Sequence, residues 1–129
     1  MGVFNNKKQD KIVLARQHVQ KAMVIIEKDK VEEGIAYKNR NYVRKAGKYL
    51  WNGVLIALDF NENGETFANP NQELQTLINI GHDTIHLSMC CDGNLSKAVC
   101  DAGFRIATEI INRCEQDSRH CEGAQRTKQ

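Results

Sequence analysis

The segment Tyr37–Asp59 constrains the fold most, because it ends in the most apolar run of the sequence, Leu50–Leu58. The segment opens with charged residues, and Asn52 is the one polar side chain within the apolar run. A helix that is apolar on all sides belongs in the middle of a bundle. We therefore expect Tyr37–Asp59 to be a central helix with the rest of the chain packed around it.

Two glycines and one amide inside this segment need a structural explanation. Gly47 and Gly53 each cost about 1 kcal/mol relative to alanine in a helix, and a close helix crossing is the usual compensation. A buried Asn52 would cost about 1–3 kcal/mol without hydrogen-bond partners. We expect Asn52 to bond a neighbouring helix or loop and to fix the register, and the alternative is that it lines a pocket.

Three further helices are predicted. In 7–30, Ile12, Ala15 and Val19 recur at three- and four-residue steps and share one face. Asn69-Pro70-Asn71-Gln72 is typical of a helix start, and the third helix should run to about Met89. A fourth helix is expected over Leu95–Cys114. No stretch alternates apolar and polar residues, so no strand is expected.

These patterns predict an all-α fold, an antiparallel four-helix up-and-down bundle in a single domain over residues 1–129. Its ordered core should span about 8–115, with a flexible polar tail over 116–129. The fourth helix carries two adjacent apolar stripes, and one bundle face needs only one. The second stripe would either cover another helix or form a homodimer surface. The stripes are Leu95, Val99, Ala102, Ile106 and Ile110, and Cys100, Phe104, Ala107, Ile111 and Cys114.

Composition limits the function classes. A net charge of +2, from 18 basic and 16 acidic residues, does not indicate a dedicated nucleic-acid binder. No apolar run reaches the roughly 20 residues needed to span a bilayer, and the first six residues lack a secretory signal. We therefore expect a cytoplasmic protein with no membrane partner. The five cysteines should be reduced there, as buried fillers; they are Cys90, Cys91, Cys100, Cys114 and Cys121.

His82 and His86 are four residues apart and would project from one helix face, as in helical zinc motifs. Asp83 would stand where such motifs place a general-base glutamate. A zinc site needs a third ligand, and Cys90, Cys91 or a distant acid are the available choices. We favour one surface histidine and one hydrogen-bonded interior histidine, and predict no metal and no cofactor. A metal-dependent hydrolase at His82 and His86 stays as an alternative.

The start of the central helix is basic. Arg40, Arg44 and Lys48 follow one another at four-residue steps and share a face that could meet phosphate. The competing interpretation, a solvated helix face, is favoured.

Three segments resemble an uncharacterised family of small bacterial helical-bundle proteins grouped with HEPN-like folds. They are Tyr37–Gly47, Trp51–Asp59 and His86–Leu95. The resemblance implies a HEPN-like bundle and assigns no activity. The family pattern keeps the histidine at position 86, but has an aromatic residue at position 82 and Gly-Tyr at positions 90 and 91. This difference weighs against metal or redox chemistry at those positions.

HEPN ribonucleases pair an arginine with a histidine, with four to six residues between them. Asn79 here stands at the arginine position relative to His86, with six residues between. Asparagine lacks the charge that would stabilise a phosphate transition state, so no catalytic set is complete. We predict a cytoplasmic interaction or binding module that is not an enzyme, acting on a protein partner or as a homodimer. The alternative is a HEPN-like RNA- or nucleotide-handling protein. The candidate binding residues are Arg40, Arg44, Asn52, Asn79 and His86.

Overall fold

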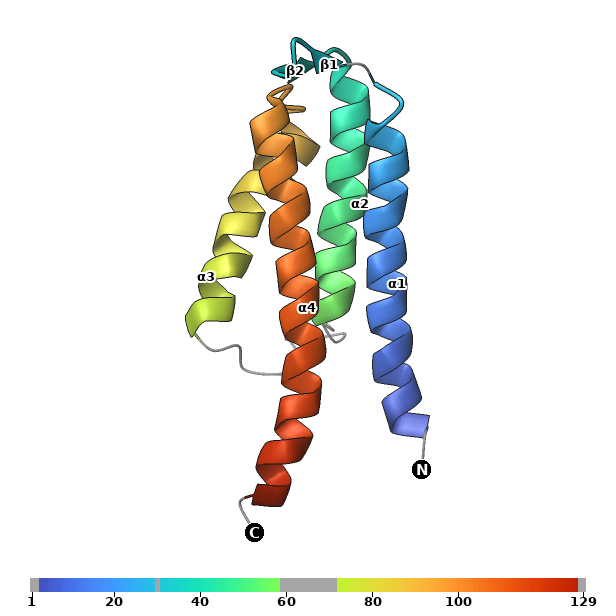
Figure 1. The fold of residues 1–129 in the computed structure, drawn as a ribbon, viewed down its shortest axis with the longest axis vertical. Coiled ribbons are helices and arrows are strands. Elements are labelled where there is room, and N and C mark those ends of the chain that lie inside the picture. The colour runs from blue at the N-terminus through green and yellow to red at the C-terminus, as the bar shows by residue number, and fades with distance from the viewer. Residues whose placement is uncertain (1–2, 30, 59–71, 128–129) are drawn as a thin grey trace.

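The structure of the chain, a computed structural model, describes residues 3–29, 31–58 and 72–127 (Figure 1). It is a bundle of four helical segments, as the sequence predicted. The first two segments are α1 (Val3–Ile26) and α2 (Arg40–Leu58). The third is α3 (Gln72–Gly81), which continues directly into a π-helix, η1 (His82–Cys91). The last is α4 (Lys97–Thr127).

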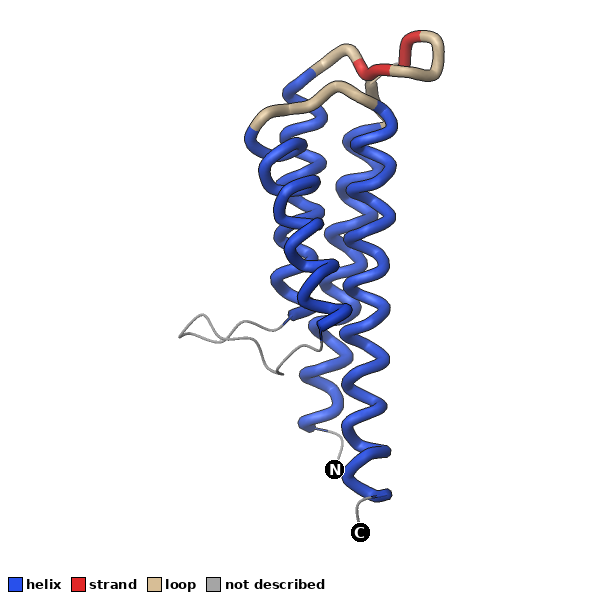
Figure 2. Tube along the Cα trace, turned by 90° about the vertical axis from the view of Figure 1, so that its left-hand side faces the viewer, coloured by secondary structure: helices blue, strands red, loops and turns tan. Residues whose placement is uncertain are grey.

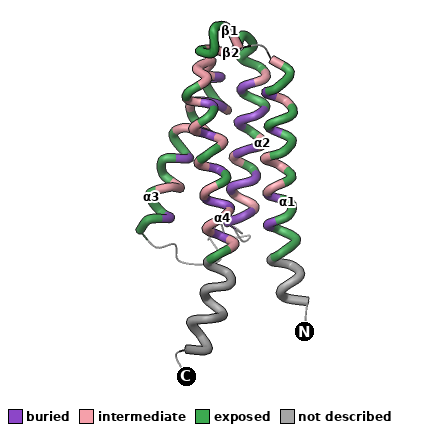
Figure 3. The backbone as a smooth tube through the Cα atoms, in the orientation of Figure 1, coloured by how far each residue is buried: buried purple, intermediate pink, exposed green. Residues whose placement is uncertain are grey.

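The helices run alternately up and down, and both chain ends lie at the same end of the bundle (Figures 1 and 2). α2 is the central helix, because it packs against α1, η1 and α4. One face of α2 is fully buried, as the purple positions in Figure 3 show. The buried residues of this face include Val43, Ala46, Leu50, Val54 and Ala57.

Both glycines of α2 lie at close helix crossings. A Cβ atom on Gly47 would lie 2.7 Å from the backbone nitrogen of Cys90 and 2.7 Å from Cβ of Met89. A Cβ atom on Gly53 would lie 3.0 Å from the carbonyl oxygen of Ala15 in α1. The two glycines therefore let η1 and α1 approach the α2 backbone, which confirms the expected compensation.

The expectation of no strands was wrong. The α1–α2 connection contains a small antiparallel hairpin, β1 (Val31–Glu32) and β2 (Ala36–Tyr37), visible at the end of the bundle in Figure 2. Glu33 and Gly34 turn the chain with φ values of 54° and 69°. Strands of two residues are too short to produce an alternating pattern, so hydrophobic periodicity could not reveal them.

The boundaries of the fourth helix also differ from prediction. It begins at Lys97, because the Ser96 side chain accepts a hydrogen bond from the Val99 backbone at 3.3 Å, as an N-cap residue does. It continues to Thr127 rather than ending at Cys114. The predicted start of the third helix, at residues 69–71, lies outside the described residues.

Both apolar stripes of the fourth helix are covered within the monomer. Cys100, Ala107, Ile111 and Cys114 are buried, and the other stripe is buried or half-buried (Figure 3). In the part of α4 whose side chains are described, 97–116, no large hydrophobic side chain is exposed. Among the described helices, none is both long and apolar enough to cross a membrane.

Candidate binding site between α1 and α2

A groove of about 470 Å³ lies between α1 and α2. This volume is within the range of roughly 300–1,000 Å³ that is usual for small-molecule sites. We call it the lysine groove. It is lined by Ile25 from α1, by Lys28 from the turn that follows α1, and by Tyr42, Lys45, Lys48, Tyr49 and Asn52 from α2.

Helical periodicity places the α2 residues of the lysine groove together. They follow one another at steps of one or three residues on the side of α2 that is turned away from the core. Tyr42 and Tyr49 are half-buried and seven residues apart, so their rings lie two turns apart along one side. The groove thus has aromatic walls, with lysine side chains around them.

The charge of the lysine groove is entirely positive. Lys28, Lys45 and Lys48 are exposed, and no carboxylate is among the lining residues. Within the described residues none of the three ammonium groups is paired with an acid. Asp29, next to Lys28, accepts hydrogen bonds from the backbone nitrogens that precede α2. Three like charges around one groove create a local positive potential that attracts anions.

Asn52 does not have the position that the sequence predicted. It is exposed at the rim of the lysine groove, so the expected buried amide that fixes the register was wrong. The apolar run around it suggested burial, but residue 52 projects from a side of α2 that the described helices leave exposed. The alternative, that Asn52 lines a pocket, is what the structure shows.

The other four candidate residues are spread along the bundle. Arg40 donates from Nη1 to the carbonyl oxygens of Asp92 and Gly93, at 3.4 and 3.2 Å. Arg44 packs close by, because a Cβ atom on Gly93 would lie 3.1 Å from its Cγ atom. Both arginines thus lie against the chain that follows η1.

His86 and Asn79 lie further along the bundle axis. His86 stacks on Trp51, which is eleven residues and about 16 Å along α2 from Arg40. Asn79 is exposed and accepts a hydrogen bond from Gln75 at 3.1 Å. The structure does not bring Arg40, Asn79 and His86 together into one site.

His82 and His86 form an aromatic cluster with Trp51. The two imidazole centroids are 5.1 Å apart, and each lies within 6 Å of the Trp51 ring, at 5.7 and 5.8 Å. His82 is exposed and its Nδ1 lies 3.6 Å from Asp83 Oδ1, whereas the Nδ1 atom of His86 is buried without a hydrogen-bond partner. The expected hydrogen bond of the interior histidine is therefore missing at this atom.

This cluster is a weak metal site. In the described part of the chain, no group of three or more His, Cys, Asp or Glu side chains is placed to hold a metal ion. The buried Nδ1 of His86 is closed to an incoming ion, which leaves one nitrogen on that ring. Cys90 and Cys91 follow on η1, and both are free thiols.

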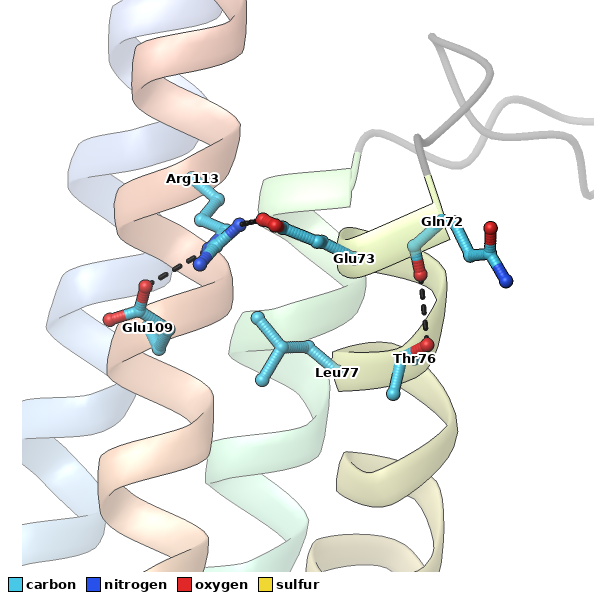
Figure 4. Close-up of a pocket in the computed structure, with 6 residues that line it drawn as sticks. All are labelled: Gln72, Glu73, Thr76, Leu77, Glu109 and Arg113. Atoms are coloured by element: carbon cyan, nitrogen blue, oxygen red, sulfur yellow. Dashed lines mark hydrogen bonds and ion pairs between the residues drawn. The ribbon is translucent and has the colours of Figure 1, made fainter.

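A second groove, of about 490 Å³, lies between α3 and α4 near the point where the described residues resume (Figure 4). Its one cation, Arg113, is bonded to Glu73 at 2.6 Å and to Glu109 at 3.0 Å. Thr76 donates to the carbonyl oxygen of Gln72 at 2.9 Å. Since the Arg113 guanidinium is already bonded to two carboxylates, the lining of this groove has no unpaired positive charge that could bind an anion.

Sequence patterns missed Lys28, Tyr42 and Tyr49. The two tyrosines at a seven-residue spacing, with Lys45 between them, are a helical signal that was available in the sequence. Lys28 lies in the turn after α1, and only the packing of α1 against α2 brings it to the same groove.

Comparisons with known proteins agree with this fold and assign no activity. A solved structure, of a protein of unknown function from Dyadobacter fermentans, superposes with a TM-score of 0.75. It is 26% identical in sequence, and the match covers 85% of this chain and 97% of that one. No curated protein matches the chain.

The family comparison matches residues 10–116 to a domain of unknown function, DUF5618. The match covers most of the chain, including α2 and the whole of η1. It confirms the resemblance to an uncharacterised helical family, while the HEPN-like relationship stays a prediction. The chain belongs to the DUF5618 family, a domain of unknown function.

Proposed function

We propose that this protein is a binding module that takes a small phosphorylated anion in the lysine groove. The observation that carries the proposal is that Lys28, Lys45 and Lys48 line one concave surface with no carboxylate in its lining, and that none of them is paired with an acid in the part of the chain that the structure describes. Like charges that face one groove repel one another, and a bound polyanion would relieve that repulsion. Phosphate oxygens accept charge-assisted hydrogen bonds, which are stronger than neutral ones.

The tyrosine hydroxyls and the Asn52 amide support an anionic ligand of this kind. A hydroxyl and an amide nitrogen both donate hydrogen bonds, so the groove can meet the oxygens of a phosphate chain with neutral donors as well as cations. Lysine binds phosphate as a flexible point charge. The groove therefore suits a chain of phosphates better than one rigidly held carboxylate.

Calorimetric titration of the full chain with tripolyphosphate tests this proposal. Lys45→Gln should weaken binding by roughly tenfold, because a hydrogen bond to a charged group contributes about 1.5 kcal/mol. Arg105→Gln is the matched control, since Arg105 is exposed on α4 and changes the net charge equally. Binding should also weaken as salt rises. Equal affinities for both variants, or no binding at low salt, would refute the proposal.

We also propose that binding needs no second copy of the chain. The predicted homodimer depended on a second apolar stripe of the fourth helix, and the monomer itself covers that stripe. Light scattering during gel filtration should give the mass of one chain with and without tripolyphosphate. A dimer that loses binding on dilution would contradict this. We place the binding in the cytoplasm, which imaging of a tagged chain would check.

A further inference from the structure

We infer that the ligand is a nucleoside polyphosphate whose base lies in a second cavity beside the lysine groove. This inference rests on the proposed function. The second cavity, which we call the α1 cavity, has a volume of about 290 Å³. Its lining residues are Gln20, Lys21, Val24, Ile25 and Tyr49.

The two cavities adjoin each other, because Ile25 and Tyr49 line both. A ligand that spans them would place its charged part among Lys28, Lys45 and Lys48. Its uncharged part would then lie past the Tyr49 ring, against α1. The required ligand has a phosphate chain at one end and a group without charge at the other.

The α1 cavity has the chemistry of a site for a planar ring. Val24 is 48% exposed, so its apolar surface is available for a ligand to cover. The Lys21 ammonium lies 5.8 Å from the centroid of the Tyr49 ring, in a cation–π arrangement. Since Lys21 is exposed, a base could enter between this cation and the ring. Stacking of a base on an aromatic side chain contributes about 1–3 kcal/mol.

Gln20 distinguishes a base from an acyl chain as the occupant. A primary amide offers both a donor and an acceptor, which is the pattern that pairs with the edge of adenine. An acyl chain would bond neither that amide nor the Lys21 ammonium, and both would stay hydrated. The polar rim around Val24 and Ile25 therefore fits an aromatic heterocycle.

Calorimetry with three probes, in the absence of divalent metal, tests the inference on the full chain. ATP should bind at least tenfold more tightly than tripolyphosphate, because only ATP adds base stacking. Hexyl phosphate, which carries an apolar chain instead of a base, should bind more weakly than ATP. Tyr49→Leu should abolish the preference for ATP, because it removes the stacking ring and so weakens ATP binding more than tripolyphosphate binding.

Two further variants complete the test. Tyr42→Leu is the matched control, since Tyr42 lines only the lysine groove, and it should preserve the ratio of the two affinities. Gln20→Ala removes an exposed side chain and should reduce ATP affinity by severalfold without affecting the fold. ATP and tripolyphosphate binding equally, or hexyl phosphate binding as tightly as ATP, would overturn this inference and leave the proposed function standing. If the wild-type chain binds neither ATP nor tripolyphosphate, both this inference and the proposed function are overturned.

Discussion

Replacing Gly47 with alanine should destabilise the bundle, although alanine is the better helix former. The new Cβ atom would lie 2.7 Å from the backbone nitrogen of Cys90 and 2.7 Å from Cβ of Met89. Neither atom can turn away, because one belongs to the backbone of η1 and the other is fixed to it. The helices would have to separate at their closest crossing.

Two opposing terms set the size of this effect. Alanine gains about 1 kcal/mol over glycine in a helix interior. Overpacking a buried contact costs about 1–3 kcal/mol, and the upper end applies here because backbone atoms must shift. The free energy of unfolding should therefore fall by about 2 kcal/mol for Gly47→Ala, with a melting temperature lower by roughly 8 °C.

Urea unfolding followed by circular dichroism measures this change. Gly53→Ala is the comparison, since its new Cβ atom would lie 3.0 Å from the Ala15 carbonyl oxygen and 3.1 Å from His18 Cβ. These contacts are looser, so Gly53→Ala should be nearer to neutral than Gly47→Ala. A Gly47→Ala variant as stable as the wild type, or more stable, would refute the close packing of α2 on η1.

Three other predictions follow from buried groups. His86→Phe should raise the free energy of unfolding by about 1 kcal/mol in urea titrations, because it removes a buried nitrogen that has no partner; a loss of stability would contradict this. Peptide mapping after brief alkylation should show Cys91 modified before Cys100, in a Cys121→Ser background, because Cys91 is exposed and Cys100 is buried; equal rates would count against the packing. Burial, with a smaller contribution from Asp101, raises the pKa of the Cys100 thiol from 9.0 to about 11. The folded chain keeps this proton between pH 9 and 11 while the unfolded chain loses it, so wild-type stability should fall across that range more steeply than in Cys100→Ala; parallel pH profiles would show that the thiol does not contribute.

Most of the fold could be predicted from the sequence, because the apolar residues of a packed helix recur at helical spacing along the chain. The apolar positions of α2 recur every three or four residues, so the identity of the central helix needed no tertiary information. The roles of Gly47 and Gly53 also followed from the sequence, since a glycine inside a helix requires a compensating contact. The short hairpin and the exact helix ends did not follow, because they depend on single hydrogen bonds such as the Ser96 cap.

The candidate site could be predicted only in part from the sequence. Asn52 was recognised as unusual, but its exposure could not be known until the packing of α1 fixed which side of α2 stays open. The basic residues Arg40 and Arg44 shared a helical face in sequence, and the structure turns them toward the end of η1 instead of a shared groove with His86. The spacing of residues along one helix predicts which of them share a face, whereas a binding groove also depends on which second helix packs beside that face.

The sequence alone thus determined the helices, their apolar faces and the close crossings at the glycines, because each of these is set by spacing along the chain. Only the tertiary structure decided that Lys28, in the turn after α1, joins Lys45 and Lys48 of α2 in one groove, and that Gln20 lines the same cavity as Tyr49. The reason is that the angular offset and vertical register between two packed helices follow from all of their contacts together. Which side chains meet across a groove is therefore not encoded in either helix by itself.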